Sequence, residues 1–342
     1  MPLQLLPGFT FLDTHHCVTG SMRHIYLYHD HPISEEMLLG LGAGVSFSYW
    51  HFKGQPPFMG GRGNVGIGSQ EGLERTAGRR TGVKVASTRT ASACKAEKGL
   101  LDLLEAGEPV MIYVDMGYLP YFDFGGKEYH FGAHMVVICG YDAESQQVLI
   151  ADRDGGHPIS MEALARARGS KFKPFPPENE WFTFDFSQKR QPTADEVIQS
   201  IHEQVQPMLH PPIRNLGVPG MRKAAQAITG WPKLMNEEEL RWTLFNTYIF
   251  IDPTGGSGGG IFRYMFSRFL REAAGVTGRP GLLESAESFQ SLGDRWQQLA
   301  GICQAAWEAP DAAACLGECA SLLNELAKQE EKAWNKLEAL LG

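Results

Sequence analysis

The chain has 342 residues, with 31 Lys and Arg against 39 Asp and Glu, which gives a formal net charge of −8. This acidic balance argues against nucleic acid as a principal partner, because non-specific nucleic-acid affinity comes from cationic surfaces. It disfavours anionic membrane surfaces for the same reason. Apolar residues make up 43% and charged residues 20%, enough for a packed core, and the length suggests two domains.

The N-terminal residues and the cysteines indicate a compartment. Residues 1–8 contain no basic region and are interrupted by proline, so they do not resemble a signal peptide. No apolar run approaches the roughly 18–20 residues of a membrane span. A disulfide framework is not expected, because the cysteines are few and unevenly spaced. We therefore predict a cytoplasmic protein with free thiols at Cys17, Cys94, Cys139, Cys303, Cys315 and Cys319.

The first predicted element is a helix over residues 17–28. Polar residues 13–16 precede it, and Val18, Met22, Ile25 and Leu27 fit one helical face. Cys17 then lies at the helix N-terminus, where the macrodipole and backbone N–H groups favour thiolate over thiol. The pattern predicts a reactive cysteine, with a buried core cysteine as the alternative.

A strand-rich region follows the first helices. Residues 100–104 close a short helix that Gly107 ends, and residues 109–114 read as a buried strand. The turn composition of residues 140–145 predicts a hairpin between the two neighbouring apolar runs. Alternation of aromatic and polar side chains adds one further strand to the same sheet. These three later strands cover residues 135–139, 147–151 and 181–186.

The hairpin brings an imidazole and a carboxylate together. If its turn is centred on Ala143, His134 lies directly opposite Asp152, with Cβ atoms roughly 4.5–5.5 Å apart. A shifted register would place Asp154 there instead. A carboxylate beside an imidazole fixes its tautomer and stabilises its charged form. A core histidine and a strand-end turn residue are the structural alternatives for the two side chains.

Together these residues predict a cysteine nucleophile and a histidine general base that is oriented by a carboxylate. Cys17 would be the nucleophile, His134 the general base and acid, and Asp152 the orienting group. The oxyanion donors would be the Cys17 backbone N–H and one side chain from the preceding loop. Residues 9–16 contain neither glutamine nor asparagine. That side chain must therefore come from Thr14, His15 or His16, or the site has no second donor.

The pattern changes to helical near residue 190. Thr193 has the composition of a helix cap, with acids in the following turn. We predict a catalytic domain at residues 1–190 and a helical domain at residues 191–342. The glycine-rich residues 255–260 precede an amphipathic run, so they either contact an anion or pack closely.

Cys315 and Cys319 have the spacing of a two-ligand metal face on a helix, but no second ligand pair accompanies them. We interpret them as small buried residues and predict no metal and no cofactor. The tryptophan-rich C-terminal helices would either cover the catalytic domain or pair two subunits in a homo-oligomer.

Several segments resemble the butirosin biosynthesis protein H family. The match covers most of the chain and is carried by an ordered set of motifs. In the N-terminal half these are FLDTHHCVTGSMR (11–23), ISEEMLLGLGAG (33–44), FSYW (47–50), YLPY (118–121) and GAHMVVICGYD (132–142). In the helical half, GGGIFR (258–263) and RFLREAA (268–274) resemble the domain of unknown function that commonly follows.

The resemblance implies an α+β fold with a papain-like cysteine core and an antiparallel sheet, followed by a mostly α-helical domain. It implies transfer of an acyl or aminoacyl group from an acyl carrier protein thioester to a small-molecule amine. By position, Cys17 would take the acyl group, His134 would move the proton and Asp152 would orient His134. A cysteine peptidase or amidase, or a non-catalytic binding module, are the alternatives. The pair Asp13-Thr14 departs from the family pattern, so the oxyanion donor does not carry over.

Two further sets of residues are substrate-binding candidates. Asp115, Tyr118, Tyr121 and His130 lie between two strands on the segment that leads to His134. They would line the acceptor pocket or simply cover the sheet. Arg62, in the glycine-rich residues 59–63, would meet a phosphopantetheine phosphate or a substrate carboxylate, with a solvated surface arginine as the alternative.

Overall fold

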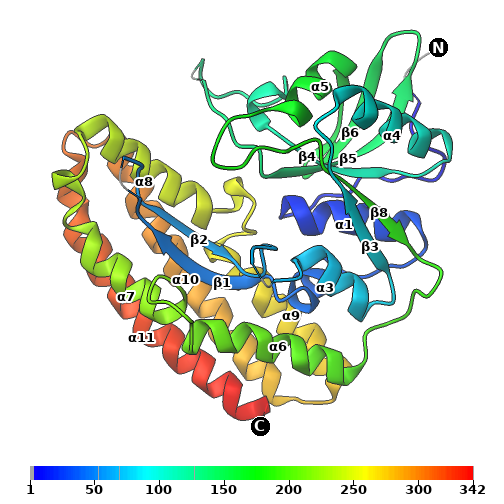
Figure 1. Ribbon diagram of the computed structural model, residues 1–342. Helices are drawn as coiled ribbons and strands as arrows, with labels where there is room; N and C mark the ends of the chain where they lie inside the picture. Colours follow the sequence, from blue (N-terminus) through cyan, green and yellow to red (C-terminus); the bar gives the residue numbers. More distant parts are fainter. Residues whose placement is uncertain (1–3, 53, 69, 127, 342) are drawn as a thin grey trace. The chain divides into compact units, whose positions relative to one another are not determined.

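A computed structural model describes residues 4–52, 54–68, 70–126 and 128–341 (Figure 1). The chain forms two compact units, and each unit consists of two separate segments. Unit 1 comprises Met1–Leu38 and Thr81–Gln191, and unit 2 comprises Leu39–Arg80 and Pro192–Gly342. The predicted α+β class, with antiparallel sheet in the N-terminal region and a helical C-terminal half, is confirmed. The domain division at residue 190 stays a prediction. Residues 39–80, which lie within the predicted catalytic domain, pack with the helical half in unit 2.

Unit 1 is built on a six-stranded sheet in which every neighbouring pair is antiparallel. The strand order is β3-β8-β4-β5-β6-β7, so the hairpin of β5 and β6 lies well inside the sheet. The three strands predicted in the region of residues 134–186 are all present. The strands are β3 (Lys84–Thr88), β4 (Val110–Val114), β5 (His134–Asp142), β6 (Gln147–Asp152), β7 (Gly155–Ser160) and β8 (Trp181–Asp185).

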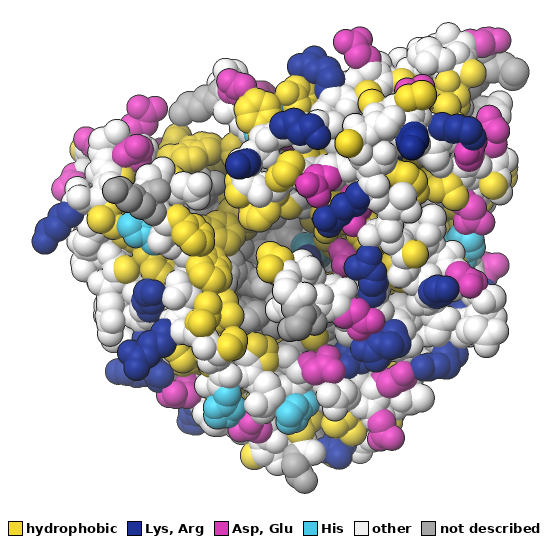
Figure 2. All heavy atoms as spheres, in the orientation of Figure 1, with side chains coloured by type: hydrophobic (Ala, Val, Ile, Leu, Met, Phe, Trp, Pro, Cys, Tyr) yellow, Lys and Arg dark blue, Asp and Glu magenta, His cyan; other side chains and the backbone are white. Residues whose placement is uncertain are grey.

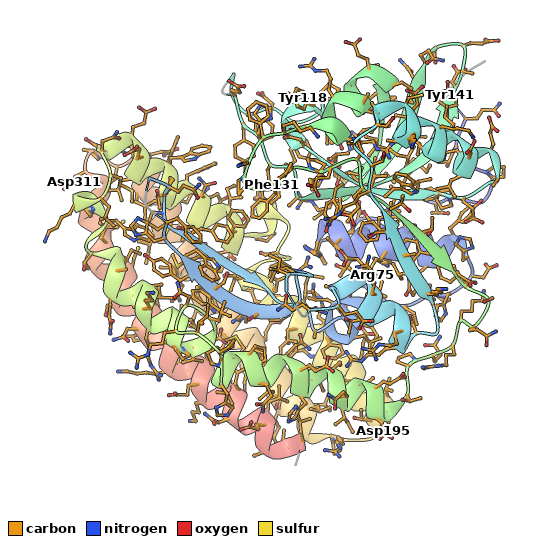
Figure 3. The ribbon with its side chains drawn as sticks, viewed as in Figure 1. Arg75, Tyr118, Phe131, Tyr141, Asp195 and Asp311 are labelled. Carbon is orange, nitrogen blue, oxygen red and sulfur yellow. The ribbon has the colours of Figure 1, made fainter. Side chains whose placement is uncertain are left out.

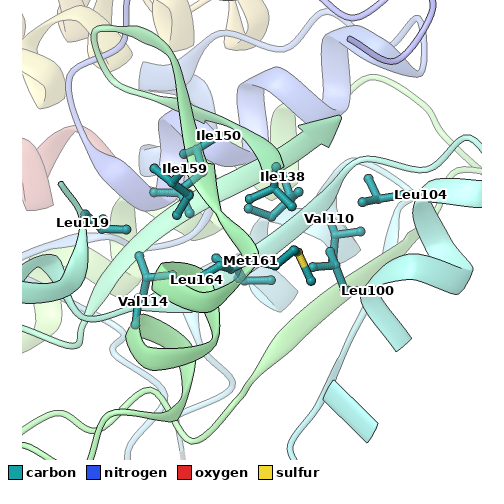
Figure 4. Packing of buried hydrophobic residues seen from close by; sticks show 14 residues of the cluster. Leu100, Leu104, Val110, Val114, Leu119, Ile138, Ile150, Ile159, Met161 and Leu164 are labelled. Carbon is teal, nitrogen blue, oxygen red and sulfur yellow. The ribbon is translucent and has the colours of Figure 1, made fainter. Parts of the chain in front are cut away.

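Helices α4 and α5 lie on one side of this sheet and α1 lies on the other (Figure 1). The side chains of Ser92 and Ser160 cap α4 and α5 through the backbone N–H three residues on. Alternate residues of the central strands pack with these helices in one apolar cluster (Figure 4). The helical elements of unit 1 are α1 (Cys17–Tyr28), α4 (Ala93–Glu105), η1 (Met116–Tyr118) and α5 (Met161–Gly169).

Helix α1 packs against β5 and β6. Val18, Met22 and Ile25 are buried as predicted, whereas Leu27, expected on the same face, is 39% exposed. The N-terminus of α1 is thereby fixed relative to the strands that carry His134 and Asp152.

Unit 2 is mostly helical and contains a two-stranded antiparallel sheet of β1 (Val45–Trp50) and β2 (Phe58–Arg62). The predicted cap at Thr193 is confirmed. Its side chain and Glu196 form a reciprocal capping box at the start of α6. The helices are α2 (Glu35–Leu41), which begins in unit 1, α3 (Leu73–Arg80), α6 (Ala194–Leu209), α7 (Gly217–Ile228), η2 (Trp231–Lys233), α8 (Glu237–Ile251), η3 (Pro253–Gly255), η4 (Gly260–Phe262), α9 (Arg263–Thr277), α10 (Gly281–Glu308), η5 (Ala312–Cys315) and α11 (Leu316–Leu341).

A buried ion pair lies at the centre of unit 2. The guanidinium of Arg263 donates to the carboxylate of Glu330 at 2.7 Å, and both side chains are fully buried. The indole N–H groups of Trp296 and Trp334 donate to the same carboxylate at 2.7 and 2.6 Å. Arg263 also donates to the carbonyl of Ser46, which connects β1 to helices α9, α10 and α11.

The glycine-rich residues 255–260 pack closely against their surroundings. A Cβ atom on Gly260 would lie 2.5 Å from the backbone of Gly293, and a Cβ atom on Gly293 would lie 2.4 Å from the ring of Tyr264, so both positions favour glycine. The close approach supports the packing interpretation of this loop rather than anion binding.

The C-terminal cysteines do not share a helix, contrary to the prediction, because Cys315 ends η5 and Cys319 lies in α11. The sulfur of Cys319 is 4.0 Å from that of Cys303, and both residues are buried. Within the described part of the chain, no group of three or more His, Cys, Asp and Glu side chains is placed to hold a metal.

On the face drawn in Figure 2, positive and negative side chains are interspersed rather than gathered by sign. Of the helices that the structure describes, none has the length and apolar composition needed to cross a membrane.

Candidate active site

Cys17 is the first residue of α1, as predicted. The preceding residue, His16, has extended backbone angles, and its side-chain Nδ1 accepts a hydrogen bond from the backbone N–H of Thr19. His16 is therefore the cap that starts the helix at Cys17. Cys17 as a whole residue is half-buried.

His134 lies between Cys17 and Asp152. It is the first residue of β5, and Asp152 is the last residue of β6. The Nε2 atom of His134 is 2.7 Å from Oδ2 of Asp152, and the two side chains are 3% and 4% exposed. Hydrogen bonding and charge between the imidazole and the Cys17 thiol lower the pKa of Cys17 and raise that of His134. Because Nε2 is held by Asp152, Nδ1 is the nitrogen left for the sulfur.

The hairpin register that was predicted for this pair is wrong. Asp142 pairs with Gln147, which centres the turn one and a half residues beyond Ala143, and a bulge follows within β5. His134 and Asp152 are therefore diagonal rather than direct cross-strand neighbours. Diagonal residues share a face and lie within reach of long side chains, so the contact forms despite the shifted register.

Asp154, the alternative partner for His134, lies outside β6. Its carboxylate contacts Nε2 of His157 at 2.7 Å, and its side chain is 74% exposed. The structure thus brings Asp152 to His134 and leaves Asp154 at the surface.

Two further donors hold the Asp152 carboxylate. The Tyr121 hydroxyl donates to Oδ2 at 2.9 Å, and the Arg153 backbone N–H donates to Oδ1 at 2.7 Å. Tyr121 was predicted to line an acceptor pocket. The structure places its hydroxyl on Asp152 and its ring against His157 at 3.9 Å between centroids.

The three groups have strongly perturbed acidities. Burial disfavours the Cys17 thiolate, but the charge of His16 and hydrogen bonds with His134 and His16 outweigh burial and hold the pKa of Cys17 well below its ordinary value. Burial likewise disfavours the charged imidazole, but Asp152 and Cys17 raise the pKa of His134 to about 9. Burial is also outweighed at Asp152, where His134, Arg153 and Tyr121 lower the pKa of the carboxyl. At neutral pH these shifts favour a thiolate–imidazolium pair.

A buried carboxylate that was not predicted organises the loop before Cys17. Oxygens of Glu35 accept the backbone N–H groups of His15 at 2.9 Å and His16 at 2.7 Å. The Thr19 hydroxyl donates to the same carboxylate at 3.0 Å. Burial raises the pKa of Glu35, and these hydrogen bonds act in the opposite direction. The sequence indicates Glu35 only as an acidic residue near the start of a helical pattern in residues 33–44. That pattern does not predict a contact with backbone about 20 residues earlier in the chain.

The three predicted oxyanion-side residues have different surroundings. Thr14 donates its backbone N–H to the carbonyl of Arg153, and its buried hydroxyl has no hydrogen-bond partner among the described residues. His15 is exposed. The His16 side chain is 5% exposed. Of these three residues, all of which the structure describes, His16 is the one that lowers the pKa of the Cys17 thiol.

Asp115 is fully buried and holds the segment between β4 and β5. It accepts the backbone N–H groups of Gly117 and Phe131, the Ser170 hydroxyl and a hydrogen bond from Nδ1 of His130. These four donors use both carboxylate oxygens, an arrangement typical of a structural anchor.

Tyr118 borders a cleft of about 640 Å³ in unit 1. Like Phe131, it lies on the segment that joins β4 to β5 (Figure 3). The Arg166 guanidinium lies 4.6 Å from the centre of the Tyr118 ring, and His130 stacks on Phe172 at 3.4 Å between centroids. The cleft is lined by Tyr118, Glu162, Ala165, Arg166, Gly169, Ser170, Lys171 and Phe172.

Arg62 ends strand β2, so the predicted glycine-rich loop at residues 59–63 is wrong for its larger part. Gly60 and Gly61 lie within the strand, and a Cβ on Gly61 would contact Ile261 at 2.6 Å. Arg62 belongs to unit 2, and its phosphate-binding role stays a prediction.

Comparison with known families divides the chain into two matches. Residues 16–153 match the family described as butirosin biosynthesis protein H, N-terminal. Residues 162–337 match a domain of unknown function, DUF4872. No curated protein matches the chain significantly. The first match begins at His16 and includes Cys17, His134 and Asp152.

Proposed function

Since this chain belongs to the DUF4872 family and carries the butirosin biosynthesis protein H N-terminal domain before it, we propose that it is a cysteine-dependent acyltransferase of natural-product biosynthesis. The family membership favours a biosynthetic enzyme. The observation that carries the proposal is the buried His134 imidazole, which lies 2.7 Å from the Asp152 carboxylate and whose pKa is raised by both Asp152 and Cys17.

In the first half-reaction the Cys17 thiolate attacks the carbonyl carbon of an acyl thioester. The tetrahedral intermediate collapses, the bond to the donor sulfur breaks, and the donor thiolate takes the proton held by His134. The products are an acyl-enzyme thioester on Cys17, a free donor thiol and a neutral His134. An acid-backed imidazole of this kind contributes roughly 10²–10⁴-fold to such proton transfers.

In the second half-reaction an amine attacks the acyl carbon and loses its proton to His134. The carbon–sulfur bond to Cys17 breaks, which releases the amide and restores the thiolate–imidazolium pair. Acylation removes the negative charge of the Cys17 thiolate and the hydrogen bond that this thiolate accepts from His134, and both of these raise the pKa of His134. The pKa of His134 is therefore lower in the acyl-enzyme than its resting value of about 9, so more of the imidazole is in the neutral form that can accept the proton of the amine.

The donor in this proposal is a thioester on an acyl carrier protein, and the acceptor is a small-molecule amine. Tyr118 is the candidate for acceptor contact because it borders the cleft in unit 1, and His130 stacks on Phe172 of the same cleft. The full burial of Asp115 and the contact of Tyr121 with Asp152 favour positioning roles for these two residues.

The proposal predicts an acyl adduct on Cys17. The protein is incubated with acyl-carrier thioesters and with acyl-pantetheine, and its intact mass is measured. We expect one acyl group on the wild-type chain, none on Cys17→Ala, and loss of the adduct with amide formation when amines are added.

Two other outcomes would favour the alternatives. Release of free acid in the presence of amines would indicate a hydrolase with the same residues. An unchanged mass of the wild-type chain with every thioester, alongside tight binding of the carrier protein, would indicate a binding module.

The rate of acyl-enzyme formation is expected to stay near its maximum through neutral pH and to fall above about pH 9. Attack needs the Cys17 thiolate, whose pKa is lowered, so this form persists well below pH 9. Protonation of the leaving thiol needs charged His134, which is lost as pH rises through about 9. The pKa values that shape the low-pH and high-pH sides of this profile belong to Cys17 and His134 as a coupled pair. Rapid-quench mass spectrometry gives the profile, and a rate that climbs steadily through pH 9 would indicate a thiol of ordinary acidity.

A further inference from the structure

A second imidazole lies at the Cys17 sulfur. His16 precedes Cys17 in the chain and is 5% exposed, and its charge and hydrogen bonding lower the pKa of the Cys17 thiol. His134 reaches the same thiol from β5. The sulfur therefore has two imidazole neighbours, and the acyl-transfer scheme above uses only one.

Thr19 allows the His16 ring to gain or lose a proton without losing a hydrogen bond. Its backbone N–H lies 3.3 Å from Nδ1 of His16, and its hydroxyl oxygen lies 3.1 Å from the same nitrogen. An unprotonated Nδ1 accepts from the N–H group, whereas a protonated Nδ1 donates to the hydroxyl oxygen. Because the Thr19 hydroxyl gives its own proton to Glu35 at 3.0 Å, its oxygen is free to accept.

Glu35 supplies the negative charge behind this arrangement. Its carboxylate receives donors from the backbone of residues 15 and 16 and from Thr19, which is the environment of an ionised group. The other titratable groups are His134 of β5, Asp152 of β6, Tyr121, which contacts the same Asp152 oxygen as His134, and the exposed His15, whose charge acts on Glu35. Of these side chains, Glu35 is the acid linked to His16.

We propose that His16 is a second catalytic imidazole, whose charged form is held by the Thr19 hydroxyl and the Glu35 carboxylate and stabilises the Cys17 thiolate. Glu35 and Thr19 are positioning residues in this scheme. The inference rests on the proposed use of Cys17 as a nucleophile.

The charge acts at two points of the reaction. Before attack it keeps the thiol ionised, with the extra proton on His16 taken from solvent. In the second half-reaction Cys17 leaves as a thiolate, and the same charge stabilises the departing sulfur. An imidazolium on each side of the sulfur thus favours both acylation and release of the amide.

The test replaces His16 by asparagine, which keeps a strong helix cap but has no titratable group. The readout is the rate of Cys17 alkylation by iodoacetamide against pH, followed on the Cys17 peptide by mass spectrometry because Cys94 is also exposed. We expect His16→Asn to raise the midpoint of the profile by about 1–3 pH units, the effect of an opposite charge at contact distance. His15→Asn, the same change at the exposed neighbour whose charge acts on Glu35, should move the midpoint by less than His16→Asn does.

Thr19 provides a second pair of variants. Thr19→Val removes the hydroxyl and keeps the backbone N–H that binds the cap, so we expect an upward shift of the same sign. Thr19→Ser restores the hydroxyl and should restore the wild-type profile. Wild-type midpoints in both His16→Asn and Thr19→Val, with unchanged helix content, would show that His16 is only a cap and overturn the inference.

This experiment needs no substrate, so it separates the two proposals. A shifted alkylation profile in a chain that accepts no acyl group would support the role of His16 and reject the acyltransferase. An acyl-enzyme that forms equally fast in His16→Asn and in the wild type would do the reverse.

Discussion

Replacement of Asp152 by asparagine is expected to lower the rate of acyl transfer by about 10²–10⁴-fold while the fold stays intact. The carboxylate lies 2.7 Å from Nε2 of His134 and is the largest influence that raises the pKa of that imidazole. Asparagine has almost the same shape but no charge, so His134 loses the partner that stabilises its protonated form. The thiolate–imidazolium pair with Cys17 then becomes less populated at neutral pH.

The matched control is Asp154→Asn, the same change two residues along the chain. Asp154 is exposed and contacts His157 instead of His134, so we expect its loss to change the rate by less than about threefold, the scale of a surface contact. Single-turnover acylation and amide formation are measured for both variants, with circular dichroism as the check on folding. Equal losses in the two variants would contradict the assignment of Asp152 as the orienting group.

Several local elements of unit 1 were predictable because each has a strong signal of its own, whereas β3, β7 and α5 were not predicted. Polar residues before an apolar helical face placed the start of α1 at Cys17, and the apolar runs on both sides of a turn gave β5 and β6. The order of strands was not predictable. Strand β8 pairs between β3 and β4, and nothing in the residues of β8 indicates which neighbours it takes.

The pairing of His134 with Asp152 was predicted by an argument that the structure corrects. The turn lies further along the chain than expected, and a bulge in β5 shifts the register again. Two residues on one face of adjacent strands still meet when they are diagonal, because imidazole and carboxylate side chains bridge the longer distance. Sequence spacing therefore found the partners but not their geometry.

Glu35 shows where sequence reasoning stopped. Its contacts with the backbone of His15 and His16 span about 20 residues and depend on how α2 returns to the N-terminus of α1. Periodicity describes one element at a time, so it contains no information about this return. The same limit applies to residues 39–80, which pack with the helices of unit 2 although they precede most of unit 1 in the chain.

Replacement of Glu330 by glutamine is expected to lower the free energy of unfolding of unit 2 by about 3–5 kcal/mol, the cost of leaving a buried charge without its partner. Glu330 and Arg263 are both fully buried, and the indole N–H groups of Trp296 and Trp334 also donate to the carboxylate. A glutamine amide offers one acceptor oxygen and turns N–H groups toward other donors, so Arg263 stays charged in an apolar setting without compensation.

The control is Glu331→Gln, one residue along α11. Glu331 pairs with Arg222 at 2.6 Å, but the two side chains are 44% and 39% exposed, and such surface pairs contribute at most about 1 kcal/mol. Denaturant unfolding followed by far-ultraviolet circular dichroism compares the two variants, since most of the helical signal comes from unit 2. A loss at Glu330 no larger than that at Glu331 would mean that the buried pair adds little to holding α9, α10 and α11 together. The two variants are therefore expected to differ at least tenfold in their folding equilibria. Solvent screens the charges of the exposed pair, whereas the charges of the buried pair are screened much less.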